Sequence, residues 1–504
     1  MYRIVALLLV FFFISPHATN AQQIVYSDYD KDDSRDMNFE VIGKMNGNFL
    51  IYKNIRWRHR ISIYDDQMKL KENVDMDFFP EKTLNVDFVI YPNSIRMIYQ
   101  YQKKNVVHCM GVTLDANAKV VGEPVELDTT RIPFFDDNKI YSTIFSEDKK
   151  KIMVFKIQKK SEKLSIASAL FNDTLGLIKR SRQTMDYDDR RESYNEFLLD
   201  NEGNMIFTRD KTPVNRDYSN VLQIGIKQPT EDTFQFFYVG LNKFYINDLK
   251  LKIDNLNKRY LINAFYYTKN RGSVQGLFSY SWDKVNMKTA SSSFTEFSDS
   301  LRAEARRDGS FRFAFDDYFI RQVVVKKDGG YWLLAEDYTA QGRNNNSNPW
   351  NRWDYYNNPY SLSQSSYYYY NPSYGYYRPY NSMYQSVRYY YENICVISVD
   401  KNGRREWENV IHKSQSDDDD NNFLSYALVN SGDALHVLYN SDNRNQIISD
   451  IQLTPNGQVY RDPTLKSHER GYQFMTQHSK QVGARLLIVP CQYRGYICFA
   501  KVEF

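Results

Sequence analysis

The sequence predicts an all-β protein built from a repeated unit of four short strands. A tight polar turn followed by a dense apolar strand recurs along the chain, most clearly at residues 326–335 (KKDGGYWLLA). A second turn, rich in Asp, Asn and Gly, recurs further on in most units. The composition agrees with this prediction. Aromatic residues favour strands, and they make up 16% of the chain, with 42 tyrosines among them.

The strand after the first turn is apolar at successive positions. In Tyr331–Ala335 the apolar residues follow one another without alternation, which predicts a strand covered on both faces. Seven further copies of this turn and strand lie at residues 46–52, 93–99, 148–155, 202–207, 257–262, 431–438 and 483–489.

The second turn predicts the hairpin between the third and fourth strands of a unit. Asp and Asn side chains satisfy the backbone of a tight turn, and Asn and Gly reach positive φ at low cost. The turn occurs at residues 65–67, 115–117, 172–174, 400–403 and 455–457. The two turns divide the chain into eight units, at residues 39–76, 86–127, 141–187, 195–239, 248–297, 319–412, 423–465 and 473–504.

Four-stranded units of about fifty residues, each with a strand covered on both faces, resemble the repeats of a β-propeller. The resemblance implies one domain over residues 22–504 with eight four-stranded blades. Seven blades are the alternative, because the fifth unit is irregular. The eighth unit supplies three strands, and residues 24–29 are expected to complete it, which joins the two ends of the chain and leaves no free edge. No WD or kelch pattern is present, so the resemblance points to no particular family.

One segment departs from the β pattern. Residues 298–308 begin with capping residues, continue with good helix formers, contain no β-branched residue and are followed by Gly309. This order predicts a short helix between the fifth and sixth units.

The amino terminus predicts export. Arg3 is followed by an unbroken apolar run over residues 4–14, and residues 19–21 offer small side chains for cleavage before Gln22. Residues 1–21 are therefore predicted to be a secretory signal peptide, with a buried strand or helix as the alternative. The residue directly after the cleavage site is not Cys, and no later apolar run approaches the length of a membrane helix. We expect a mature protein in the periplasm or outside the cell, with neither a lipid anchor nor a membrane span.

The cysteines leave two alternatives open. Cys491 and Cys498 flank a two-residue turn at Arg494 and Gly495, which places them across a hairpin. Because exported compartments permit disulfides, a cross-strand disulfide and a pair of buried thiols are equally compatible with this position. Cys109 and Cys395 complete the set of four cysteines.

A tyrosine-rich insertion lies at residues 340–392, between the second and third strands of the sixth unit, and holds fifteen of the 42 tyrosines. In an antiparallel meander this loop shares a face with the connections between blades, where the long segments 209–220 and 297–317 also fall. Long loops on a rigid scaffold commonly carry binding, and Tyr suits recognition surfaces. The alternative is a disordered insertion without a fixed role. The candidate binding residues are Trp350, Trp353, Tyr367, Tyr368, Tyr376, Tyr377, Arg378, Tyr389 and Tyr390.

Several function classes are not favoured. The net charge of +4, from 65 basic and 61 acidic residues, gives no nucleic-acid footprint. His436 lies in an apolar strand and is interpreted as a core residue, and the acidic runs at 28–36 and 417–420 as solvated loops. No nucleophile elbow, phosphate loop or metal-ligand spacing is present, so we expect no catalytic residue, metal or cofactor.

Two functional hypotheses remain. The first is an exported, non-enzymatic propeller that docks or scaffolds proteins of the cell envelope, for example in an outer-membrane or secretion assembly. The second is a carbohydrate-binding or glycoside-hydrolysing propeller, in which a pair of carboxylates from different blades would be invisible in the sequence.

Overall fold

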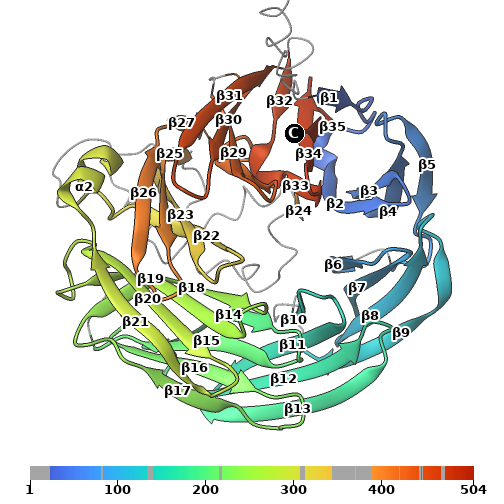
Figure 1. The fold of residues 1–504 in the computed structure, drawn as a ribbon. Helices are drawn as coiled ribbons and strands as arrows, with labels where there is room; N and C mark the ends of the chain where they lie inside the picture. Colours follow the sequence, from blue (N-terminus) through green and yellow to red (C-terminus); the bar gives the residue numbers. More distant parts are fainter. Residues whose placement is uncertain are drawn as a thin grey trace, which may run out of the picture.

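The computed structural model of the chain describes residues 23–80, 83–132, 140–214, 218–306, 313–342, 369–370, 387–418, 421–441, 444, 446–466 and 471–504. These residues form eight antiparallel sheets that follow one another in chain order around a central axis (Figure 1). The predicted eight-bladed propeller is confirmed and the seven-bladed alternative is wrong. The predicted signal peptide lies outside the described residues.

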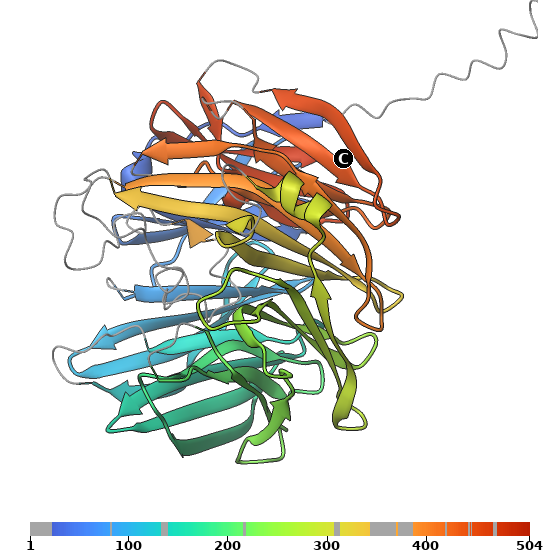
Figure 2. The same cartoon turned by 90° about the vertical axis from the view of Figure 1, so that its left-hand side faces the viewer.

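Each of the first four blades is a meander whose first strand lies nearest the axis and whose fourth lies at the rim (Figure 1). The strands run between the two faces of the ring (Figure 2). Blade 1 comprises β2 (Met37–Met45), β3 (Asn48–Ile55), β4 (Arg58–Tyr64) and β5 (Leu70–Asp75); blade 2 comprises β6 (Thr83–Ile90), β7 (Ser94–Lys103), β8 (Val106–Asp115) and β9 (Val120–Arg131); blade 3 comprises β10 (Tyr141–Phe145), β11 (Lys151–Lys160), β12 (Lys163–Asn172) and β13 (Leu177–Asp186); blade 4 comprises β14 (Glu192–Leu199), β15 (Met205–Lys211), β16 (Val221–Lys227) and β17 (Gln235–Val239).

The next three blades repeat this order, and the fifth is a regular four-stranded sheet despite its irregular sequence. Blade 5 comprises β18 (Tyr245–Asp254), β19 (Arg259–Tyr267), β20 (Gly276–Asp283) and β21 (Lys288–Glu296); blade 6 comprises β22 (Tyr318–Val325), β23 (Tyr331–Gly342), β25 (Val387–Val399) and β26 (Arg405–Ile411); blade 7 comprises β28 (Tyr426–Asn430), β29 (Leu435–Asn440), β30 (Ile447–Leu453) and β31 (Val459–Lys466).

Blade 8 joins the two ends of the chain. β1 (Gln23–Tyr26) pairs antiparallel with β35 (Tyr496–Glu503), which continues the hairpin from β34 (Leu486–Tyr493). The expected closure by the amino-terminal strand is therefore confirmed. The innermost strand differs from the prediction, because the 3₁₀ turn η6 (Thr476–His478) divides it into β32 (Tyr472–Phe474) and β33 (Lys480–Gly483), and both pieces pair with β34.

The hydrophobic core consists of layers between neighbouring blades. On β3, Phe49 and Ile51 belong to the cluster shared with blade 8, whereas Leu50 and Tyr52 belong to the cluster shared with blade 2. All four side chains are buried. Each second strand is thus covered on both faces, which explains its unbroken apolar run and confirms that part of the prediction.

The predicted helix is α2 (Asp299–Ala305). The Ser298 hydroxyl caps it by accepting a hydrogen bond from Leu301 N at 3.1 Å. Leu301 and Ala305 pack into the layer between blades 5 and 6, at the rim of the ring beside β26 (Figure 1). The helix ends before Arg306, and the expected stop at Gly309 lies outside the described residues. In the part of the chain that the structure describes, no helix is long and apolar enough to cross a membrane.

Candidate functional site

One face of the ring, which we call the turn face, carries the turns between first and second and between third and fourth strands. Asp115 Oδ1 accepts hydrogen bonds from Asn117 N and Lys119 N at 2.8 Å, while Ala118 adopts a φ of 59°. Two backbone N–H groups of the tight hairpin turn are therefore hydrogen-bonded within the turn itself. The same pair of bonds, to the second and fourth residues beyond an Asp or Asn, recurs at Asp65, Asn172 and Asp400.

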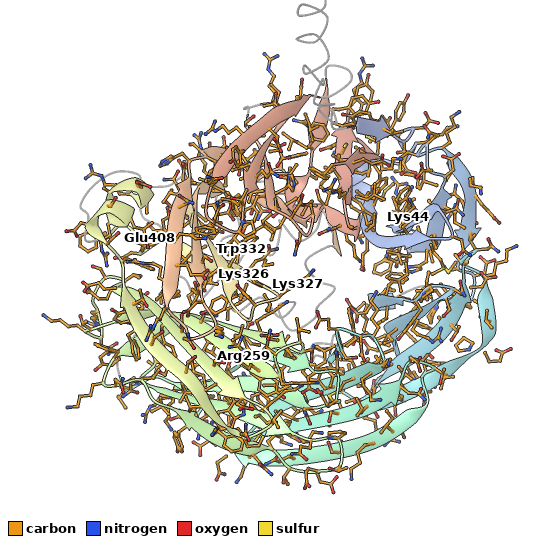
Figure 3. All side chains as sticks on the ribbon, viewed as in Figure 1. Lys44, Arg259, Lys326, Lys327, Trp332 and Glu408 are labelled. Atoms are coloured by element: carbon orange, nitrogen blue, oxygen red, sulfur yellow. The ribbon has the colours of Figure 1, made fainter. Side chains whose placement is uncertain are left out.

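Turns of neighbouring blades also contact each other on this face. Asp328 Oδ1 accepts from Gly330 N at 2.8 Å and Gly329 has a φ of 86°, as the sequence of this turn predicts. Arg259 of blade 5 reaches the turns of blade 6 and donates to Gly329 O, and to Lys401 O at 2.9 Å (Figure 3). The turn face therefore repeats the Asp or Asn turn in blades 1, 2, 3 and 6, whereas blade 4 has the longer turn 228–234.

The opposite face, which we call the loop face, carries the loops between second and third strands and the connections between blades. Here the ring divides into two halves. Blades 8, 1, 2 and 3, the tight half, have two-residue turns at 494–495, 56–57, 104–105 and 161–162. Blades 4 to 7, the elaborated half, have the longer loops 212–220, 268–275, 343–386 and 441–446.

The tyrosine-rich insertion leaves the ring through an extended arm. β23 and β25 remain paired as far as Gly342 and Val387, so residues 340–342 and 387–392 belong to strands. The insertion therefore covers 343–386 and is shorter than the predicted 340–392. β27 (Gln415–Asp418) pairs with residues 388–391 of β25 and adds a third strand. We define the arm as residues 338–342, 387–391 and 415–418.

The two predicted binding tyrosines on the arm have different surroundings. Tyr389 is buried with Ala340, Tyr391 and Leu424, so it packs the arm against the ring. Tyr390 is half-buried, and Arg388 Cζ lies 5.5 Å from the centre of its ring. The other predicted binding residues lie outside the described residues: Trp350, Trp353, Tyr367, Tyr368, Tyr376, Tyr377 and Arg378.

Part of the insertion lies against blade 1, which blades 7 and 8 separate from blade 6. β24 (Tyr369–Tyr370) pairs antiparallel with β2, Tyr369 opposite Glu40 and Tyr370 opposite Phe39. A segment of blade 6 thus extends the inner edge of blade 1 near the axis (Figure 1). Added strands cover exposed sheet edges, and the same pairing is used in peptide recognition.

Beside β24, Glu40 is a buried carboxylate on an inner strand. Its Oε1 lies 3.6 Å from Lys480 Nζ of blade 8. Burial raises the pKa of Glu40 to about 8, against the opposing effect of Lys480. The first and last blades therefore meet at a contact between the Glu40 carboxyl and the Lys480 amine beside the edge that β24 covers, and burial favours the protonated form of this carboxyl at neutral pH.

Buried polar contacts fix the base of the arm. Glu336 Oε1 lies 2.8 Å from Lys413 Nζ, and its Oε2 accepts from the Ser425 hydroxyl at 2.7 Å. Lys413 also donates to Tyr391 O, at 2.9 Å. Glu336 and Lys413 are both fully buried, and their network joins blade 6, its connection to blade 7 and the arm.

Inner-strand bulges make further links between blades of the elaborated half. Glu196 and Asp248 lie at bulges of β14 and β18, each with a φ of 56°. Glu196 Oε2 accepts from Leu251 N at 3.3 Å, and Asp248 Oδ2 accepts from Ile320 N. A bulge re-aims a side chain, and here it directs a carboxylate onto the backbone of the next blade.

An open depression of about 360 Å³ lies beside α2 and the 268–275 loop. Glu296 and Asp299 both contribute to its lining. Arg302 is buried there and donates to Val274 O at 3.0 Å and Gln275 O at 2.7 Å, so it supports the loop. The polar lining and the two carboxylates could accommodate hydroxyl-rich ligands.

The structure places Cys491 directly opposite Cys498, around a turn in which Arg494 and Gly495 have φ of 49° and 85°. This placement confirms the expected hairpin. Both residues are buried thiols here, and Cys498 Sγ donates to Cys491 O at 3.5 Å. A disulfide between them remains a prediction, as does the export that would permit it.

A cluster on blade 7 was missed by sequence reasoning. His436 Nδ1 lies 3.0 Å from Asp450 Oδ2 and 3.9 Å from Asp462 Oδ2, although His436 was interpreted as a core residue. The signal was available, because Asp450 and Asp462 are equally far from Asn456 in the predicted turn and therefore face each other across the hairpin.

No family model and no curated protein matches the chain. Among solved structures it is similar to a prolyl endopeptidase, with 9% identity and a TM-score of 0.42 over 92% of this chain and 55% of that one. It is also similar to Sqt1 from Saccharomyces cerevisiae, with 9% identity and a TM-score of 0.41 over 95% and 100% of the two chains. The polysaccharide lyase Uly1 has 8% identity and a TM-score of 0.37 over 82% and 89%. The chain spans about half the length of the prolyl peptidases it matches. The propeller assignment rests on the eight sheets themselves.

Proposed function

We propose that this chain is an exported, non-enzymatic β-propeller that docks a protein partner of the cell envelope on the loop face of its elaborated half. The observation that carries the proposal is the grouping of the longer second-to-third loops on four consecutive blades. Loops of variable length on a rigid scaffold are the usual place for recognition. The turn face instead repeats one local turn geometry in four of the blades, where the side chains bond their own turns.

The chemistry of the arm and insertion suits a protein partner. Tyr390 and Arg388 lie together on the arm, and Arg388 Nε is 3.8 Å from Asp418 Oδ1. Aromatic and guanidinium groups are enriched among the residues that dominate protein interfaces. The sequence places many further tyrosines in residues 343–386, which are side chains of the same kind.

Replacing residues 343–386 with Asn-Gly tests the docking surface. Because Gly342 and Val387 are paired, a two-residue turn can close the arm and keep the four strands of blade 6, while the inner edge of blade 1 loses β24. Affinity purification from the native envelope should recover a stoichiometric partner with the full chain and lose it with the shortened one.

The matched control is Trp57→Asn, which removes an aromatic side chain that is 55% exposed in the 56–57 turn of blade 1, on the loop face of the tight half. This variant should keep the partner. Equal recovery of the partner by the shortened chain, with an unchanged thermal unfolding midpoint, would contradict the docking proposal.

Export is a separate part of the proposal. The charged, apolar and small-residue regions of residues 1–21 support a signal peptide, and a periplasmic or secreted protein in an outer-membrane or secretion assembly is the setting we propose. The mature protein should begin at Gln22. Amino-terminal sequencing of protein from fractionated cells checks this, and an intact Met1 would overturn it.

A second candidate function is carbohydrate binding or hydrolysis in the depression beside α2. Glu296 and Asp299 on its lining favour it. If this function holds, a glycan array should show binding by the full chain, and Glu296→Gln should weaken that binding while the shortened chain retains it. Absence of binding on the array would remove this candidate.

A further inference from the structure

Three potential metal ligands come together on blade 7, apart from the docking surface. His436 lies on β29, Asp450 on β30 and Asp462 on β31, so each of three adjacent strands contributes one residue. Their ligand atoms all lie within 4.8 Å of one another. His436 Nδ1 faces both carboxylates, at 3.0 Å from Asp450 Oδ2 and 3.9 Å from Asp462 Oδ2.

The arrangement brings two negative charges together in a shielded place. Asp450 and Asp462 are direct partners in the β30–β31 register, where like charges destabilise a sheet. The Asp450 side chain is fully buried and that of Asp462 is 31% exposed. A cation between the two carboxylates would remove the repulsion, and the exposed edge at Asp462 gives it a path from solvent.

The spacing fits a small metal ion. With ligands at about 2.0–2.1 Å, the ligand atoms of a tetrahedral zinc site are separated by roughly 3.3 Å. The separations from His436 Nδ1, 3.0 and 3.9 Å, lie on either side of that value. Binding would require a small movement of Asp462, the most exposed of the three side chains.

We propose that His436, Asp450 and Asp462 bind one divalent transition-metal cation of the Zn²⁺ class, with a fourth position open to water. One imidazole and two carboxylates suit such a cation, whereas Ca²⁺ requires six to eight oxygen ligands. His436 binds through Nδ1 as the neutral imidazole, and its ring rests against Phe504, 5.0 Å away.

The site lies beside the layer between blade 7 and blade 8, the blade that joins the two ends of the chain. Leu438 and Ile448, on the same two strands as His436 and Asp450, share a hydrophobic cluster with Leu487 of blade 8. A metal that joins the three strands of blade 7 therefore stabilises one wall of this layer. Occupancy should raise the thermal unfolding midpoint by about 2 °C or more at saturating metal.

The experiment uses the full mature chain, freed of metal by a chelator, with Zn²⁺ as the probe. Isothermal titration and equilibrium dialysis should find one tightly bound Zn²⁺ per chain. Asp462→Asn should weaken that binding at least about 100-fold, since losing even an outer partner of a metal ligand costs 10–100-fold. Ca²⁺ should not compete.

The control is Glu126→Gln. Glu126 Oε2 lies 2.9 Å from His108 Nδ1, so the variant alters a histidine–carboxylate pair on neighbouring strands outside the proposed site. It should leave Zn²⁺ binding unchanged, and His436→Ala serves as a second test variant if Asp462→Asn does not fold. Absence of a stoichiometric site in the wild-type chain, or wild-type affinity in Asp462→Asn, would overturn the proposal.

Discussion

The tight and elaborated halves of the ring share the same blades but differ at the loop face. Blades 8, 1, 2 and 3 turn with two residues between second and third strands, whereas blades 4 to 7 use longer loops, including the arm and insertion. Both halves have the same buried layers between blades, as at Leu50 in one and Leu333 in the other. The layers between blades are thus compatible with short and long loops alike. Loop length can therefore vary for recognition without changing this packing.

The largest effect is expected at the base of the arm, in the elaborated half. Glu336→Gln removes the buried carboxylate that pairs with both Lys413 and Arg321, which should cost about 3–5 kcal/mol. Urea unfolding measures the loss. Asp418→Asn on the arm surface, where the pair with Arg388 is 3.8 Å long and exposed, should change stability by less than about 1 kcal/mol. A loss below that level for Glu336→Gln would show that the network does not hold the arm.

A matched pair of core variants tests whether the two halves share one core. Leu50→Ala between blades 1 and 2 and Leu333→Ala between blades 5 and 6 remove equally buried side chains. Each should cost about 2–5 kcal/mol through lost burial and a cavity, as seen in urea unfolding. A consistently smaller cost at Leu333 would mean that the loops loosen the blades beneath them.

The regular features of the fold were predictable because they depend on local chemistry. The apolar run at residues 49–52 predicts a strand covered on both faces, and neighbouring blades cover it. The Asp115 turn predicts a local hydrogen-bonded hairpin, and its side chain makes those bonds. Closure by β1 followed from one strand missing in the last unit.

The less predictable features join residues far apart in the chain. The pairing of Tyr369 with Glu40 and the ion pair between Lys413 and Glu336 both depend on how blades are placed around the ring. The carboxylate of Asp248 reaches the next blade because a bulge in β18 points it in that direction. No residue pattern in the sequence predicted that bulge. The candidate site was therefore predicted as a face and a loop, and its anchoring residues were not.

A smaller effect concerns pH in the tight half. Burial lowers the pKa of His59 to about 4, so His59 stays neutral in the fold while an unfolded histidine binds a proton below about 6.5. The free energy of unfolding should therefore be unaffected by His59 above pH 6.5. It should fall by about 1.4 kcal/mol per pH unit as the pH drops from 6.5 to 4. His59→Gln should flatten the urea-unfolding profile over this window. An equally steep decline in the variant would assign acid sensitivity to other groups.

In the elaborated half, Asp210 has the opposite pH dependence. Burial raises the pKa of Asp210 to about 6, although Ser219 Oγ donates to it at 2.5 Å. The contribution of Asp210 to the free energy of unfolding is complete below pH 3.8. It falls as the pH rises through 6, because the carboxyl loses its proton at a lower pH in the unfolded chain than in the folded one. The stability of Asp210→Asn relative to wild type should therefore increase between pH 4 and 6. A constant difference over this range would show that Asp210 ionises equally in both states.

The smallest effect is expected on the turn face, which the two halves have in common. Asp115→Ala in the tight half and Asp400→Ala in the elaborated half each remove an acceptor of two backbone hydrogen bonds. Each substitution should cost about 1 kcal/mol, because the freed N–H groups are close to solvent and exchange one partner for water. Partner recovery should be unchanged in both variants, since the proposed docking surface is on the other face. Loss of the partner in Asp400→Ala with little change in stability would place recognition on the turn face and reverse the roles assigned to the two faces.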